Sequence, residues 1–286
     1  MVIAWVAYIN FHGDEVPDAG RDAFYARSSI VIPNNQNIAV AISGINAPVG
    51  KDIIGQGRYV LYAYQNEILS SELKNKILKD IEIKFTGKRD ELDCWLYDDV
   101  TKTFENCASK ERIQALFQEN KLLIERYKKL YQIPSWQGLS SSGEQTLLDI
   151  NRLLVADIKL NINAGNAELA YLKWKVNTVF INQVLKHGTN TIEKAIFLVI
   201  DCFNFTSLEY LQLKQPQILT DHYDELMVLL RPIGLTKYNL QGMLKTDFHF
   251  YEDNLFEKVT PEQNVRINYI LNRIYRVHGD FLKEAP

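Results

Sequence analysis

The chain has 286 residues, of which 47% are hydrophobic and 23% are charged, and this is the composition of an ordinary folded protein. Its formal net charge of −3 gives no general attraction to nucleic-acid phosphate or anionic lipid, so no nucleic-acid partner is expected. Within the body of the chain, no apolar run reaches the roughly 18 residues of a membrane span, and none is predicted there.

The first nine residues, Met1 to Ile9, are uniformly apolar, and residues 10–20 have the Gly, Pro and acidic composition of a linker. The segment lacks the basic start and the small-residue cleavage site of a signal peptide. Two interpretations remain open, a buried strand or first helical turn and the outer end of a truncated membrane anchor whose beginning was cut away. Because Trp5 and Tyr8 suit a membrane interface and no Lys or Arg precedes Arg21, we treat residues 1–20 as an anchor end and linker.

Residues 21–108 combine short strand signals with one helix, which predicts an α+β part. The runs Ile30–Ile32 and Ile38–Ile42 are rich in β-branched residues and are either strands or irregular segments packed on helices. Apolar residues at helical spacing predict a helix from Asp52 to about Leu78. The strict alternation of residues 81–85 predicts a half-buried strand.

Residues 109–286 are predicted to be helical. Ser109 can cap a helix to Tyr131, where Ile133-Pro134 stops it. Ser141 and Glu144 have capping-box spacing, and a helix capped by Asn166 is expected to end at His187. Further starting signals occur at Asn190–Glu193, Thr206–Glu209 and Thr260–Gln263, the last opening a helix to about Val277.

Short connections between these helices force neighbours to pack antiparallel. The predicted fold is therefore mainly α, with stacked antiparallel helical hairpins and a small α+β N-terminal part. Gly165, Ala170 and Trp174 resemble positions in the second helix of a tetratricopeptide repeat, but no fixed-period repeat is visible elsewhere.

Motifs for phosphate binding and nucleophilic catalysis are incomplete. The loop from Gly44 to Lys51 is one residue too long for a phosphate-binding loop, and Asp52 stands where a magnesium-binding hydroxyl is needed. Ser140 and Ser141 each lack one of the two flanking glycines of a nucleophile elbow. No catalytic residue and no cofactor are predicted.

Five histidines occur, none in a recognised metal motif. The densest clusters of ligand-type residues surround His222 and His249, and together they could form a two-histidine carboxylate site. We favour solvated helix ends instead and predict no bound metal, because scattered ligands lack enforced geometry. His187 and His278 are interpreted as helix C-terminal caps, and Trp136 as an exposed aromatic in a connection.

Three cysteines allow at most one intramolecular disulfide. Cys94 and Cys107 flank a short polar stretch that could form a closed loop. Cys202 lies in an apolar run and is interpreted as a small buried hydrophobe. A cytoplasmic protein with three unrelated thiols is the alternative.

Several motifs resemble those of uncharacterised Gram-negative bacterial proteins that have an N-terminal membrane anchor and a helical, envelope-facing body. The motifs are Ile42–Pro48, Gly57-Arg58, Cys94-Trp95, Cys107, Glu119-Asn120 and Glu125–Tyr127. The resemblance covers nearly the whole chain and implies location rather than activity. It favours the anchor interpretation of residues 1–20, and it makes a Cys94–Cys107 disulfide plausible in an oxidising compartment.

Together these features indicate a non-enzymatic periplasmic protein, tethered to the inner membrane, that binds another protein as an assembly factor or toxin-immunity protein. Two alternatives stay open. One is a hydrolase of unrecognised type that uses His222 or His249 with dispersed carboxylates. The other is a binder of lipid or another small molecule, which requires a large apolar cavity.

Overall fold

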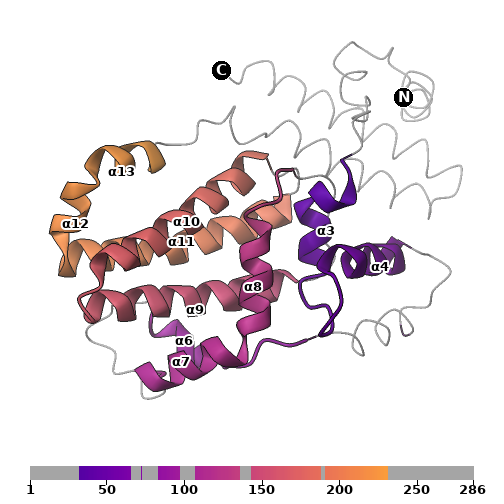
Figure 1. The fold of residues 1–286 in the computed structure, drawn as a ribbon, viewed down its shortest axis with the longest axis horizontal. Coiled ribbons are helices and arrows are strands. Elements are labelled where there is room, and N and C mark those ends of the chain that lie inside the picture. The colour runs from indigo at the N-terminus through magenta and orange to yellow at the C-terminus, as the bar shows by residue number, and fades with distance from the viewer. Residues whose placement is uncertain are drawn as a thin grey trace, which may run out of the picture. The chain divides into compact units, whose positions relative to one another are not determined.

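The computed structural model describes residues 32–65, 72, 83–96, 107–135, 143–187 and 191–230. These belong almost entirely to one compact unit, Ile32–Gly188 with Ile192–Ile233. The helices are η1 (Asn34–Gln36), α3 (Ile38–Ser43), α4 (Ile53–Gln65), α6 (Arg89–Asp93), α7 (Lys110–Glu119), α8 (Lys121–Leu130), α9 (Glu144–Asn163), α10 (Ala167–His187), α11 (Thr191–Lys214), α12 (Pro216–Asp221) and α13 (Tyr223–Leu229) (Figure 1). The described residues contain no strand, which confirms the mainly α prediction.

The strands predicted near the N-terminus are not present where the structure describes the chain. Residues 38–43 form helix α3, whose N-cap is Asn37, and the Asn37 side chain accepts a hydrogen bond from the Ala39 amide. All six residues are buried, so their alternation of large and small side chains reflects burial on every side rather than a pleated strand. Residues 83–85 have no regular structure, and Ile30-Val31 lie outside the described residues.

Helices α3 and α4 cross with their backbones in contact. A Cβ atom on Gly44 would lie 1.8 Å from the Ile53 carbonyl oxygen, and one on Gly57 would lie 1.8 Å from the Val40 carbonyl oxygen. No side chain fits at either position, because real carbon atoms never approach oxygen so closely. The crossing therefore requires glycine on both sides.

The loop that follows α3 is held by a buried guanidinium. Arg126 of α8 donates hydrogen bonds to the carbonyl oxygens of Ile45 (2.9 Å), Ala47 and Pro48 (3.0 Å). Burial lowers the pKa of Arg126, and the carboxylate of Asp52 opposes that shift. The Arg126 guanidinium thus binds the carbonyl oxygens of the loop from Gly44 to Lys51, which superficially resembles a phosphate-binding loop.

The helix predicted over residues 109–131 is two helices, α7 and α8. Its start is confirmed, because the Ser109 side chain accepts a hydrogen bond from the Arg112 amide. The break falls at the buried Asn120, whose side chain accepts from the Thr86 amide (2.8 Å) and donates to the Thr86 carbonyl (2.7 Å). These long-range hydrogen bonds offset the loss of helix continuity at Asn120. No local sequence pattern predicts them.

Helices α9, α10 and α11 form the long stack of the unit (Figure 1). The predicted capping box at Ser141 does not start α9, because the N-cap is Gly143 with φ of 99°. Helix α10 runs to His187 as predicted. Helix α11 continues through Thr206, where a new helix was expected, because the Thr206 hydroxyl donates to the Phe203 carbonyl instead of capping a new turn.

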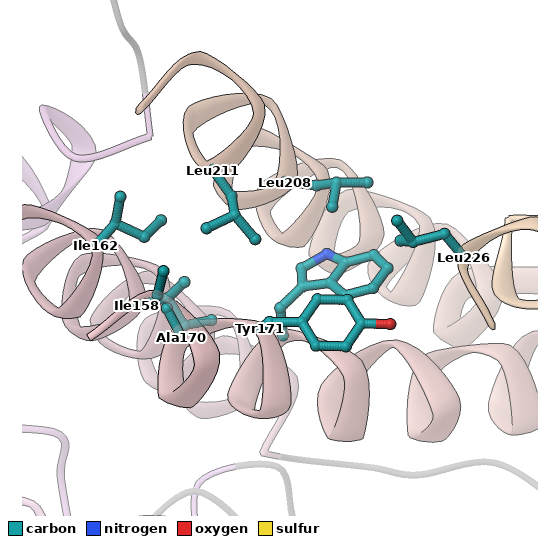
Figure 2. Close-up of a cluster of buried hydrophobic side chains, with 9 residues drawn as sticks. Ile158, Ile162, Ala170, Tyr171, Leu208, Leu211 and Leu226 are labelled. Atoms are coloured by element: carbon teal, nitrogen blue, oxygen red, sulfur yellow. The ribbon is translucent and has the colours of Figure 1, made fainter. Parts of the chain in front are cut away.

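A continuous apolar core joins this stack to α13 (Figure 2). Its buried members are Ile158, Ile162, Ala167, Ala170, Tyr171, Trp174, Leu208, Leu211 and Leu226. They come from four helices that are separate in the sequence. Burial of this surface is the main driving force that holds α9, α10, α11 and α13 together.

A buried polar network crosses the same stack. The Tyr127 hydroxyl donates to Asn177 Oδ1 (2.8 Å), and the Asn177 amide donates to Asn151 Oδ1 (3.0 Å) and Asn204 Oδ1 (3.3 Å). Burial raises the pKa of Tyr127, which keeps its hydroxyl protonated as a donor. Because each side chain comes from a different helix, the network fixes how α8, α9, α10 and α11 align.

By length and composition alone, residues 193–214 of α11 could cross a membrane. No membrane span was expected in this part of the chain. In the structure, α11 packs one face into the core and buries Asn204, whose amide donates to Thr178 Oγ1 (2.7 Å). That face is therefore committed to protein contacts.

Candidate functional site

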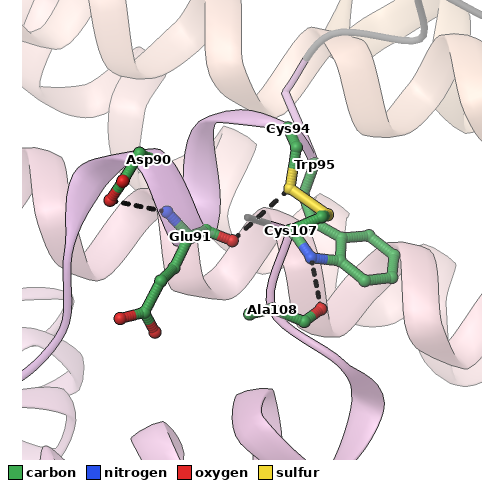
Figure 3. Close-up of a disulfide and its surroundings, with 6 residues drawn as sticks. All are labelled: Asp90, Glu91, Cys94, Trp95, Cys107 and Ala108. Carbon is green, nitrogen blue, oxygen red and sulfur yellow. Dashed lines mark hydrogen bonds between the residues drawn. A yellow bond between two sulfur atoms is a disulfide. The ribbon is translucent and has the colours of Figure 1, made fainter. Parts of the chain in front are cut away.

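Cys94 and Cys107 lie at disulfide distance, as expected, with sulfur atoms 2.07 Å apart and Cα atoms 5.7 Å apart (Figure 3). The Cα separation is in the usual range for the bond. Cys94 follows α6 directly, and Cys107 lies just before Ser109, the N-cap of α7. The disulfide therefore ties the end of one helix to the beginning of the next.

Three further contacts fasten the same two helix ends, and with the disulfide we call them the α6–α7 brace. The Trp95 indole donates to the Ala108 carbonyl (3.2 Å), and the Ala108 amide donates to the Glu91 carbonyl (3.0 Å). The Arg112 guanidinium pairs with the Glu91 carboxylate at 2.9 Å, and this hydrogen bond raises the pKa of Arg112. The brace fixes where α7 starts relative to the rest of the fold.

Helix α7 forms one wall of a groove of about 660 Å³, and α9 with the start of α10 forms the other. This volume is in the range of known ligand sites. Its lining residues are Lys110, Ile113, Gln114, Ala115, Phe117, Gln118, Asp157, Leu160, Asn161, Ala164, Asn166 and Lys173. We call it the α7–α9 groove.

The groove combines apolar side chains with side-chain amides. Ile113 is buried, and with Phe117 and Leu160 it supplies apolar surface. Gln114 and Gln118 lie one turn apart on the exposed side of α7. Across the groove, Asn166 can donate and accept hydrogen bonds. Asn161 can accept through its Oδ1, because its amide nitrogen already donates to the Asp157 carbonyl oxygen (2.8 Å).

The charges of the groove are unevenly matched. Lys173 pairs with Asp157 at 2.5 Å, and the Asn161 amide donates to the same carboxylate at 3.3 Å. Lys110, the first residue of α7, is exposed and makes no ion pair with any described residue. Within the described part of the chain, Lys110 is therefore a groove cation without an ion pair, and the carboxylate that interacts with it electrostatically is that of Glu111 beside it on α7.

The structure brings His222 close to carboxylates, but not to the acids beside it in sequence. His222 Nε2 lies 3.1 Å from Glu168 Oε1 of α10, and Nδ1 lies 3.8 Å from Glu225 Oε2 of α13. Its ring stacks on Tyr171 with centroids 4.1 Å apart. His249, the other member of the possible two-histidine site, lies outside the described residues.

Glu225 is the centre of this charged cluster. It accepts a hydrogen bond from the Tyr171 hydroxyl (2.7 Å) and pairs with Lys175. The hydrogen bond from Lys175, with that from Tyr171, lowers the pKa of Glu225, while burial raises the pKa of Tyr171. We call the set of Glu168, Tyr171, Lys175, His222 and Glu225 the charged clasp, because it joins α10 to α13 and to His222 between α12 and α13.

The clasp lies apart from the two cavities found in the described part of the chain. The described residues hold no cluster of three His, Cys, Asp or Glu side chains suited to a metal ion. His222 lines neither the α7–α9 groove nor a second cavity of about 250 Å³ that is lined by Tyr131, Pro134 and His187. Among the described residues, the side-chain contacts of His222 are with α10 and α13.

His187 ends α10 as expected, and burial, with nearby Lys186 and Lys194, lowers its pKa. The prediction for Cys202 is wrong, because its thiol is exposed on α11. The core face of α11 passes through Ile200 and Asn204, so the residue midway between them points away from it. Trp136, Ser140 and Ser141 lie outside the described residues.

Sequence reasoning missed the groove residues Lys110, Gln114 and Gln118. The available signal was a pair of glutamines four residues apart beside the apolar stripe of α7, which is a common surface pattern. Only the packing of α7 beside α9, far away in the sequence, turns that pattern into a groove wall.

No protein-family model, curated protein or solved structure matches the chain.

Proposed function

We propose that this chain is a non-enzymatic binding protein that receives a segment of another protein in the α7–α9 groove. The observation that carries the proposal is the composition of that groove, whose lining combines side-chain amides from both walls with the apolar side chains of Ile113, Phe117 and Leu160. Specific recognition sites combine apolar contact with a few placed polar groups in this way.

The lining residues favour binding over catalysis. Histidine, cysteine, serine and tyrosine, the usual nucleophiles and general bases, do not occur among them. The one carboxylate, Asp157, is engaged by Lys173 and Asn161 and so is not poised to accept a proton from a substrate. A lipid binder would require a larger share of apolar lining than this groove has.

For location, we propose the periplasmic side of the inner membrane, with residues 1–20 as the end of a membrane anchor and its linker. The support is the α6–α7 brace, because disulfides persist in oxidising compartments and are rare in the cytosol. A tethered, disulfide-containing binding protein fits the role of an assembly factor or of an immunity protein against a delivered toxin.

The proposal is tested by placing a photo-activated cross-linking amino acid at Gln118 in the full-length protein and illuminating living cells. Lys129 is the matched control, because it is also an exposed helix residue but does not line the groove. We expect one protein to be captured from position 118 and not from position 129, with cross-linked peptides that map to a single segment of that protein.

Equal capture from both positions would contradict the assignment of the groove. Capture of a lipid or other small molecule in place of a protein would favour the second of the alternative functions. If a protein were captured only from position 129, the chain would still be a binding protein, but its interface would lie outside the α7–α9 groove.

A further inference from the structure

We infer that the segment received by the α7–α9 groove is an extended peptide that carries acidic side chains. This inference rests on the proposed function and adds the chemistry of the partner. Two features of the groove lead to it, namely the amides on its walls and the unmatched charge of Lys110.

The side-chain amides of the groove indicate that the bound peptide has an extended backbone. An extended peptide exposes its own N–H and C=O groups, and each needs a partner when it leaves water. Gln114 and Gln118 on one wall and Asn166 on the other offer both donors and acceptors. Asn161 offers an acceptor only, because its amide nitrogen already donates to Asp157. A helical segment satisfies its backbone internally and would be better served by an apolar groove.

The charges of the groove indicate that the bound peptide carries acidic side chains. Asp157 is already paired with Lys173, so its negative charge is matched before any partner arrives. Lys110 has no ion-pair partner among the described residues and lines the same groove. A carboxylate from the partner would neutralise Lys110, whereas a basic segment would meet two lysines.

The position of Lys110 allows a clean test, because it is the first residue of α7. An acidic residue at the first turn of a helix is favourable, so Lys110→Glu is expected to fold. Lys121→Glu is the matched control, since Lys121 is the first residue of the equally long helix α8 and does not line the groove.

The experiment selects random dodecapeptides displayed on phage against the full-length oxidised protein, and then measures the binding of the selected peptides by fluorescence anisotropy. We expect enrichment of Asp and Glu. Lys110→Glu should weaken binding of these peptides by about tenfold, and Lys121→Glu should leave it unchanged. Raising the salt from about 0.1 M to about 1 M, which shortens the screening length from about 10 Å to about 3 Å, should weaken wild-type binding as well.

Neutral or basic peptides that bind in the groove, with cross-links from position 118, would overturn the acidic inference and leave the proposed function standing. Acidic peptides that bind Lys110→Glu as tightly as the wild type would also overturn it. If no peptide is selected and position 118 captures no protein in cells, both the inference and the proposed function fail.

Discussion

The α3–α4 crossing and the charged clasp hold the described fold together by opposite means. At the crossing, two backbones touch through Gly44 and Gly57, and the nearby loop is held by carbonyl oxygens that bind Arg126. At the clasp, charged side chains at the surface join α10 to Glu225 and His222. The first junction depends on shape and tolerates no added atom, whereas the second depends on protonation and salt.

The strongest way to break the shape-dependent junction is to add one methyl group to it. Gly57→Ala places a Cβ 1.8 Å from the Val40 carbonyl oxygen, so α3 and α4 must separate. We expect a loss of roughly 3–4 kcal/mol in the free energy of unfolding, measured by urea denaturation.

Gly55→Ala is the control in the same helix, because the nearest atom to its new Cβ would be an Asp52 carboxylate oxygen at 3.6 Å. There we expect a gain of about 0.5–1 kcal/mol from helix propensity. Equal effects at positions 55 and 57 would show that the two backbones do not meet.

The disulfide provides the next largest expected effect. Replacing Cys94 and Cys107 with serine releases a loop whose ends are 13 residues apart, which corresponds to about 3 kcal/mol in the chain-entropy model. Cys202→Ser is the control and should change stability little, because Cys202 is exposed.

Thiol counting on the denatured, unreduced protein checks the same bond. One free thiol out of three cysteines is expected for protein made in an oxidising compartment. Three free thiols would remove the main support for both the brace and the envelope location.

The clasp should show a smaller effect that depends on pH. Glu225→Gln removes the carboxylate that Lys175 and Tyr171 contact, so the variant should be less stable than the wild type at pH 7. The pKa of Glu225 in the folded protein lies below its ordinary value of 4.5. The Glu225 carboxylate therefore stabilises the fold above about pH 4.5, and this stabilisation is lost as the pH falls through the pKa of the folded state.

Thermal denaturation at neutral and at acidic pH measures the difference in stability between Glu225→Gln and the wild type. This difference should disappear at acidic pH. Glu209→Gln is the control, because Glu209 is exposed and makes no ion pair with a described residue. A difference for Glu225→Gln that stays constant between the two pH values would mean that the clasp does not act through charge.

The two junctions also differ in how far the sequence predicts them. Capping patterns correctly locate the start of α7 at Ser109 and the span of α10, because these signals are local. The crossing was missed because Gly44 and Gly57 lie at a contact between helices only once residues 38–43 form a helix. The β-branched composition of residues 38–42 instead predicts either a strand or an irregular segment. The His222 contacts were missed because Glu168 is 54 residues away in the sequence.

The same limit applies to the candidate site. The Cys94–Cys107 pair could be anticipated from two cysteines flanking a short polar segment, which is local information. The groove could not be anticipated, since Gln118 and Asn161 line one groove only because α7 packs beside α9. The proposed boundary between residues 108 and 109 and the anchor assigned to residues 1–20 stay predictions.

Hydrogen exchange on the full-length oxidised protein, with and without a selected peptide, tests the central claim most directly. Peptide binding in the α7–α9 groove should slow exchange in residues 110–118 and 157–166 and leave the clasp residues 222–229 unchanged. Protection confined to the clasp, or to any surface that excludes α7, would contradict the assignment of the groove as the binding site.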